Sequence, residues 1–288
     1  METLREVVSS ARRLVVPGDG VDLAVLVWPG DGDVVVFAHP TGFHKEIWAA
    51  TVRALRAAGC GGTLVAVDLR GHGDTPRPAV PPDVWGYASD VGSVAARFTR
   101  EAERKVGVGH SLGGMAVTAA QIRYRCFDRL VLIDPALISP DRAAEVAADN
   151  MWAESARRRR PAFPSRDDAY LTYRHKPVFA DWPDEMLALY VDYGFSARDG
   201  VWALKCDPDW EAATFSQPSF PEVWRAARGL DVPTTLITAG RSPTHPPDVA
   251  ESTARHLDAR HVRLEDRGHF VPMEAPEVVA DAVIDALS

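Results

Sequence analysis

Apolar and polar positions change from one periodicity to another soon after residue 30. The segments 13–16 and 21–28 alternate, and the turn residues Pro17-Gly18-Asp19-Gly20 between them predict a hairpin of antiparallel strands. The run 33–38 is continuously apolar, as in a parallel strand covered on both faces, and residues 45–58 then carry apolar side chains at helical spacing. The opening of the chain therefore predicts a hairpin that leads into a parallel sheet.

Predicted strands and helices continue to alternate up to Pro135 and again from residue 234. The further predicted strands are 63–67, 105–108, 130–133, 234–237 and 261–264. The further predicted helices are 85–101, 112–124, 249–257 and 275–287. This order is typical of the α/β class, with a doubly wound, mostly parallel sheet.

The middle of the chain breaks this alternation with aromatic residues, arginines and amphipathic helical spacing. We expect an inserted helical cap at 137–224, after the sixth strand, and a core domain formed by residues 1–136 and 225–288. Such an insertion would lie across the carboxyl ends of the strands, where open α/β sheets bind ligands.

Ser111 stands in the run Gly109-His110-Ser111-Leu112-Gly113, between a predicted strand and a predicted helix. Small neighbours permit a sharp turn in which the serine backbone is strained. The turn would expose the hydroxyl above the sheet edge, at a helix N-terminus whose free N–H groups stabilise negative charge. This context predicts a nucleophile; the alternative is a chance glycine–serine turn.

A serine hydroxyl is a poor nucleophile at neutral pH and needs a base at the same end of the sheet. His269 follows the last predicted strand, in a loop that contains Gly268 and precedes the last helix. We therefore expect His269 to be the base, although a lone loop histidine is usually solvated.

Two further segments, with Ser111 and His269, make the chain similar to the α/β-hydrolase fold superfamily. They are His39-Pro40-Thr41-Gly42-Phe43 and Asp68-Leu69-Arg70-Gly71-His72-Gly73-Asp74-Thr75. Within the superfamily, the chain resembles bacterial serine hydrolases with an inserted helical cap. The side chains of His72 and Asp74 are expected to satisfy local backbone groups rather than to act in catalysis.

The resemblance implies an oxyanion hole formed by the backbone N–H groups of Thr41 and Leu112. The sequence departs from the family at Pro40, where glycine is usual. Gly42 therefore remains an alternative donor to Thr41.

The acid that would orient the base is not where most of these relatives have it. Their aspartate follows the seventh strand, but here that loop reads Gly240-Arg241-Ser242-Pro243-Thr244 and has no carboxylate. Asp134 ends the sixth strand, and some members of the fold resemble this arrangement, so we expect Asp134 to orient His269. Asp134 as a helix cap, and Asp248 as the acid, are the alternatives; Asp248 is more typical of the first turn of a helix.

Aromatic residues suggest an apolar binding pocket. Substrate contacts are expected from Phe43 and Phe270, which flank the oxyanion loop and the base, from His110 beside the serine, and from Trp152 in the cap.

Four consecutive arginines, 157–160, sweep most of a helix circumference, so at least one should point inward. An inward arginine would anchor a substrate carboxylate or phosphate. The alternative is a solvated face with an ion pair between Glu154 and Arg158.

The composition of the chain limits the kinds of binding partner that we expect. A formal net charge of −8 and an isoelectric point near 5.6 argue against nucleic acid or an anionic membrane as the target, and favour a small substrate that is apolar or aromatic in part. We expect a cytoplasmic protein, because the sequence shows neither a leader nor an apolar run of the roughly 18 residues that a membrane span needs. The sequence suggests no metal site and no cofactor, and it leaves a homodimer open.

The expected function is that of a cofactor-free serine hydrolase, which cleaves a carboxylic ester or lactone with a hydrophobic portion through an acyl-enzyme on Ser111. Thioesterases, amidases, carbon–carbon bond hydrolases and acyltransferases use the same parts. A ligand-binding protein and a non-hydrolytic enzyme on the same fold are further alternatives.

Overall fold

A computed structural model describes residues 2–142, 150–217 and 221–288, and within these ranges the main sheet has eight strands. Their order is β1-β2-β4-β3-β5-β6-β10-β11. The strands are β1 (Arg12–Pro17), β2 (Asp22–Trp28), β3 (Val34–Ala38), β4 (Thr63–Val67), β5 (Lys105–His110), β6 (Arg129–Ile133), β10 (Thr234–Ala239) and β11 (Arg260–Leu264). Strand β2 is antiparallel to β1 and β4, and the other pairs are parallel, as the alternation predicts.

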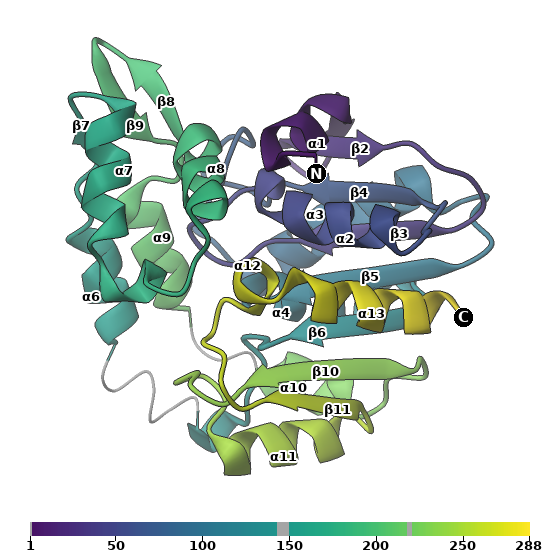
Figure 1. The fold of residues 1–288 in the computed structure, drawn as a ribbon. Helices are drawn as coiled ribbons and strands as arrows, with labels where there is room; N and C mark the ends of the chain where they lie inside the picture. The colour runs from purple at the N-terminus through teal and green to yellow at the C-terminus, as the bar shows by residue number, and fades with distance from the viewer. Residues whose placement is uncertain (1, 143–149, 218–220) are drawn as a thin grey trace.

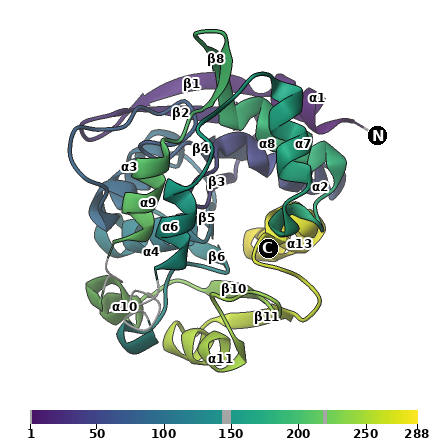
Figure 2. The ribbon, with the colours of Figure 1, turned by 90° about the vertical axis from the view of Figure 1, so that its left-hand side faces the viewer.

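Helices cover both faces of this sheet (Figures 1 and 2). One face packs against α1 (Leu4–Ser10), α2 (Ala49–Ala57) and α13 (Pro276–Leu287). The other packs against α3 (Val84–Phe98), α4 (Leu112–Tyr124), α10 (Pro221–Ala227) and α11 (Pro247–His256). The doubly wound prediction is therefore confirmed, and no helix of the described ranges is long and apolar enough to cross a membrane.

Strand β3 shows why its sequence is apolar throughout. Val35 and Phe37 join the apolar cluster on the α2 and α13 face, whereas Val34, Val36 and Ala38 join the cluster on the α3 and α4 face. Both faces of the strand are buried, which removes the polar alternation of a half-exposed strand.

The elements between β6 and α10 lie beyond one end of the sheet, and we call residues 151–215 the cap (Figure 1). Its helices are α6 (Met151–Arg157), α7 (Arg166–Arg174), α8 (Asp184–Gly194) and α9 (Pro208–Phe215), with the 3₁₀ turn η2 (Pro177–Phe179). It also contains an antiparallel sheet of β7 (Ala162–Phe163), β8 (Phe195–Arg198) and β9 (Val201–Leu204). Residues 143–149 and 218–220 of the predicted 137–224 insertion lie outside the described residues.

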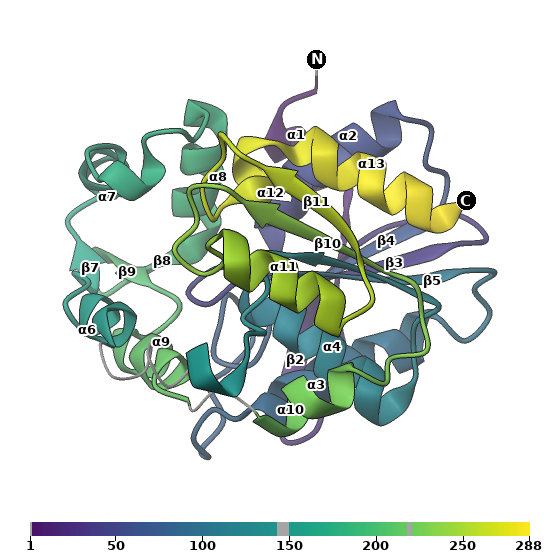
Figure 3. The ribbon, with the colours of Figure 1, turned by 90° about the horizontal axis from the view of Figure 1, so that it is seen from below.

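The small sheet differs from the wholly helical cap that the sequence predicts. Its strands have two to four residues and are mostly half-buried or exposed, so they lack a buried apolar run. Helix α10 contains position 224, the predicted end of the insertion, and packs against α4 on the main sheet (Figure 3).

Candidate active site

Ser111 occupies the sharp turn between β5 and α4. Its backbone has φ +52° and ψ −116°, a strained conformation for a residue with a side chain, and its N–H donates to Ile133 O at 3.0 Å. The turn depends on glycine at two close approaches. A Cβ on Gly109 would lie 2.3 Å from Gly113 O, and one on Gly113 would lie 2.0 Å from Ala38 O. The glycines of the motif are therefore required by backbone packing.

Asp134 and His269 meet at the same end of the sheet. Asp134 directly follows β6, and its N–H donates to Ile237 O at 2.8 Å. Its Oδ2 lies 2.5 Å from Nδ1 of His269, the residue two positions before α12 (Val271–Glu274). Ser111 and His269 line the same cavity, although the described contacts contain no hydrogen bond between the serine hydroxyl and the imidazole. Such bonds are often long without substrate.

Two residues that the sequence analysis missed also contact Asp134. The Ser242 hydroxyl donates to Asp134 Oδ2 and lies 3.4 Å from His269 Nδ1. His245 is fully buried, and its Nδ1 lies 3.3 Å from Asp134 Oδ1. Burial alone would raise the pKa of Asp134, but His245 and His269 together hold it well below its usual range. The carboxylate is therefore kept ionised beside His269.

Both residues lie in or just after the loop in which most relatives carry their acid. The absence of a carboxylate in Gly240-Arg241-Ser242-Pro243-Thr244 was the available signal. A polar group on this loop was to be expected, because a buried carboxylate on the neighbouring strand needs hydrogen-bond donors. Asp248, the alternative acid, is exposed in the first turn of α11.

The predicted oxyanion donors face the cavity from two directions. Thr41 comes from the loop after β3, and Leu112 is the first residue of α4. Neither N–H donates to another residue in the described part of the chain. Gly42 has φ +80°, so this loop needs glycine at the position after Thr41. Thr41, Leu112 and Ser111 thus line one cavity, and the N–H groups of Thr41 and Leu112 have no hydrogen-bond acceptor among the described residues.

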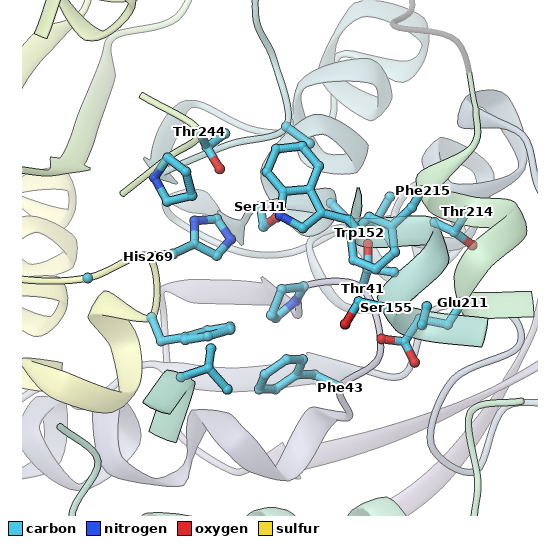
Figure 4. A pocket seen from close by; sticks show the side chains of 18 of the residues that line it. Thr41, Phe43, Ser111, Trp152, Ser155, Glu211, Thr214, Phe215, Thr244 and His269 are labelled. Carbon is cyan, nitrogen blue, oxygen red and sulfur yellow. The ribbon is translucent and has the colours of Figure 1, made fainter. Parts of the chain in front are cut away.

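The cavity encloses about 620 Å³ between the sheet and the cap, within the range of small-molecule sites. Phe43, Phe270 and Trp152, from which substrate contacts are expected, line the cavity. Figure 4 labels Phe43 and Trp152 among the lining residues. The rings of Phe43 and Phe270 are 5.3 Å apart. The cavity also has polar lining from the cap, which gives it an apolar part and a polar part.

His110 does not line the cavity, contrary to the prediction that it contacts substrate. Its side chain is fully buried, with Nε2 2.9 Å from the carbonyl oxygen of His269. Burial, together with the neighbouring His269, lowers the pKa of His110 to about 3. The residue next to Ser111 points into the core, because successive strand residues face opposite sides of the sheet.

The arginine run divides between surface and interior. Arg158 pairs with Glu154 on the exposed face, whereas Arg159 is partly buried on the cavity wall and pairs with Glu211 of α9. The expectation that at least one arginine points inward is confirmed. Glu211 itself was missed, since nothing in its local sequence distinguishes it from a surface acid of a helix.

The loop after β4 makes the predicted local contact at His72 but not at Asp74. His72 Nδ1 lies 3.0 Å from Arg70 O, whereas the Asp74 carboxylate pairs with Nζ of Lys45 and of Lys205 instead of with local backbone groups. No group of three or more potential metal-ligating side chains occurs among the residues that the structure describes.

The sequence pattern of the alpha/beta hydrolase family matches residues 35–282, so the chain belongs to that family. An abhydrolase domain-containing protein, AKT2 of Alternaria alternata, is 26% identical over 220 residues, which cover 62% of this chain and 81% of that protein. N-formylmaleamate deformylase of Pseudomonas putida is 25% identical over 211 residues, which cover 72% of each chain.

Among solved structures, E-2-(acetamidomethylene)succinate hydrolase superposes with a TM-score of 0.77 at 20% identity, covering 96% of this chain and 99% of that one. This likeness shows the alpha/beta hydrolase fold. The relatives come from a fungus as well as a bacterium, so the similarity does not single out bacterial members of the family.

Proposed function

We propose that this protein is a serine hydrolase that cleaves a carboxylic ester or lactone with a hydrophobic portion. The observation that carries the proposal is the 2.5 Å contact between Asp134 and His269, on a cavity that His269 shares with the strained Ser111. The phenylalanine rings beside these residues favour an acyl or alcohol group with apolar surface.

In the proposed reaction, the Ser111 hydroxyl attacks the substrate carbonyl carbon while His269 Nε2 takes the hydroxyl proton. Asp134 accepts the hydrogen bond from His269 Nδ1 and stabilises the imidazolium. The N–H groups of Thr41 and Leu112 donate to the oxyanion of the tetrahedral intermediate. His269 then gives its proton to the leaving alcohol, and an acyl-enzyme remains on Ser111.

Water resolves the acyl-enzyme by the same steps. His269 takes a proton from the water as its oxygen attacks the acyl carbon, and returns the proton to Ser111 Oγ as the acid product leaves. A thioester, an amide or an activated carbon–carbon bond could be cleaved by the same groups. The class of bond is therefore decided by comparing matched esters, lactones and acyl thioesters as substrates, and not by the triad.

The test is labelling with a fluorophosphonate, with the adduct located by peptide mass spectrometry. We expect one adduct on Ser111, its loss in Ser111→Ala, and its retention in Ser155→Ala, which removes another hydroxyl from the cavity lining. Asp134→Asn should lower kcat for esters on the order of 10³- to 10⁴-fold, whereas Asp248→Asn should not.

Several outcomes would contradict the proposal. Labelling of wild-type protein at another residue, or no labelling, would refute Ser111 as the nucleophile. Ester hydrolysis by wild-type and Ser111→Ala protein that is no faster than in buffer alone would favour a ligand-binding protein. An exclusive preference for acyl thioesters over matched esters and lactones would replace the ester proposal with a thioesterase.

A further inference from the structure

The cavity wall contains a buried ion pair that the proposed reaction does not use. The Arg159 and Glu211 side chains are 12% and 8% exposed, and Arg159 Nη1 donates to Glu211 Oε2. Arg159 Nη2 also donates to the hydroxyls of Tyr173, at 2.9 Å, and Tyr190, at 2.8 Å. Two tyrosines of the cap thus fix the position of the pair.

A buried ion pair of this kind is weak evidence for stability. Removing two charges from water costs about as much as their mutual attraction returns, and apolar residues of similar volume often serve a core equally well. The placement of Arg159 and Glu211 on a ligand-sized cavity therefore calls for another explanation. In such cavities, a few fixed polar groups orient the ligand.

The pair packs directly against the oxyanion loop. A Cβ built on Gly42 would lie 2.5 Å from Glu211 Oε1 and 3.1 Å from Arg159 Nη1. The Tyr190 hydroxyl reaches the Gly42 carbonyl oxygen at 3.5 Å. Figure 4 shows the Glu211 carboxylate on the side of the cavity where Thr41 lies. A ligand group bound by Glu211 would therefore lie close to the carbonyl that the oxyanion loop holds.

One carboxylate oxygen of Glu211 is available to a ligand. Oε2 receives the hydrogen bond from Arg159, whereas Oε1 accepts no hydrogen bond from any residue in the described ranges. A desolvated carboxylate oxygen gains from a donor and loses from an apolar neighbour. Because Arg159 balances the charge of Glu211, the site as a whole does not attract a cation, and Glu211 repels an anion.

We propose that the Arg159 and Glu211 pair is a specificity site for a neutral hydrogen-bond donor, either a hydroxyl or an amide N–H, carried by the substrate near its scissile carbonyl. The donor binds Glu211 Oε1, and Arg159 with the two tyrosines holds the carboxylate in place. This inference rests on the proposed function for the identity of the reacting carbonyl.

Matched esters test it. The acyl side is compared with p-nitrophenyl butanoate and its 3-hydroxy and 3-acetamido analogues, and the alcohol side with propyl and 2-hydroxyethyl butanoate. We expect wild-type kcat/KM to favour a donor-bearing ester about 10- to 100-fold in at least one series, as a hydrogen bond to a buried carboxylate allows. The 3-amino and 3-carboxy analogues should show no such gain.

Variants separate recognition from folding. Arg159→Met with Glu211→Met should reduce the preference to near one while the unsubstituted ester is still hydrolysed, and Glu211→Gln alone should reduce it several-fold, because neutral hydrogen bonds are weaker. The matched control is Glu154→Gln, which neutralises the acid of the exposed Arg158 pair and should keep the preference.

The inference is also measured without turnover, as the ratio of dissociation constants of the same ester pairs for Ser111→Ala. Equal binding and equal turnover of the two esters in every matched pair would overturn the specificity site. Hydrolysis of p-nitrophenyl butanoate in the same experiment would still support the proposed function. A binding preference for the donor in a protein that hydrolyses neither ester would support the site and refute the hydrolase. If the double variant lost kcat/KM equally for both esters of a matched pair, the ion pair would have a structural role only.

Discussion

The two carboxylate oxygens of Asp134 lie close to two histidines and a serine. Oδ2 faces His269 and the Ser242 hydroxyl, so the side of Asp134 that orients the imidazole is fully engaged. His245 Nδ1, at 3.3 Å, is the ring nitrogen nearest to Oδ1 in the described contacts, and neither oxygen is exposed. From this proximity we infer that His245 is a positioning residue for Asp134 and, through it, for His269.

Replacing His245 should lower kcat with little change in KM, because the substrate does not touch it. His245→Phe removes the ring nitrogen that lies 3.3 Å from Asp134 Oδ1, and the loss of this polar neighbour of a buried carboxylate predicts a reduction of about 10-fold or more. His245→Asn should recover much of the activity, since an asparagine amide can take the place of Nδ1. Steady-state kinetics, normalised to the fraction labelled by fluorophosphonate, measures both.

The comparison of Phe and Asn variants distinguishes positioning from packing. A purely structural role would make both variants unstable and leave the kcat of the folded fraction at the wild-type value. Unchanged kcat in His245→Phe would contradict the positioning role.

The residues of the site differ in how far the sequence predicts their positions. Ser111 and His269 are set by strand and helix ends, which the periodicity of the chain predicts. Asp134 also ends a strand, so its proximity to His269 was predictable from the parallel topology. His245 and Glu211 reach the site only through tertiary packing, and His110 is turned away from the cavity by the pleat of β5.

At the scale of elements, a buried lysine joins the 3₁₀ turn η1 (Lys45–Trp48) to the loop after β4. Lys45 is 1% exposed, and its Nζ lies 2.6 Å from Asp68 Oδ2, 2.7 Å from Asp74 Oδ2 and 3.2 Å from Glu46 Oε1. Burial alone would lower the pKa of Lys45, but the three carboxylates raise it above its usual value. The ammonium therefore stays charged and fixes the two segments to one another.

Lys45→Met should destabilise the protein by about 3 to 5 kcal/mol, since it leaves the buried carboxylate of Asp68 without its cation. The control is Lys205→Met, which removes the 2.5 Å contact to the partly exposed Asp74 and should cost about 1 kcal/mol or less. Urea unfolding measures both. Equal effects of the two variants would show that Lys45 adds nothing beyond a surface ion pair.

Long elements of the main sheet were predictable, and short ones were not. Strand β4 and helix α4 have their predicted ends, and α3 ends at Phe98 rather than at 101. Helix α1 was missed because seven residues carry too little periodicity, although its capping box, Thr3 with Glu6, is visible in the sequence. The short strands of the cap pair with one another rather than with the main sheet, so no buried run marks them.

At the scale of the whole molecule, the cap and the main sheet share apolar packing. One buried cluster contains Phe43 of the loop after β3, Tyr190 of the cap and Val279 of α13. The Phe43 ring lies 5.0 Å from the Tyr190 ring and 5.9 Å from that of Trp182. The predicted insertion is therefore continuous in sequence, but its core is not separate from that of the sheet, and this could not be read from the order of elements.

Histidines buried in the interior make the stability of the fold depend on pH. His39, His72 and His110 are each fully buried. Burial lowers the pKa of His39 well below its usual value, that of His72 to about 4 and that of His110 to about 3. Their pKa values return to about 6.5 in the unfolded chain, which then binds more protons than the folded protein between these values. Their neutral state thus stabilises the fold above pH 6.5, and this stabilisation is lost as the pH falls.

His72 isolates the effect, because it lies away from the cavity, in the loop after β4. Lowering the pH from 6.5 to 5.0 should lower the free energy of unfolding of the wild type by about 1.5 kcal/mol more than that of His72→Gln, which has no titrating group at this position. His175→Gln, which removes a solvent-exposed histidine, should keep the wild-type pH dependence. Urea unfolding at both pH values measures the difference directly, because contributions from carboxylates such as Asp68 are common to all three proteins and cancel. Parallel pH dependence of wild-type and His72→Gln protein would mean that His72 accepts its proton in the folded state, so that its burial does not keep it neutral.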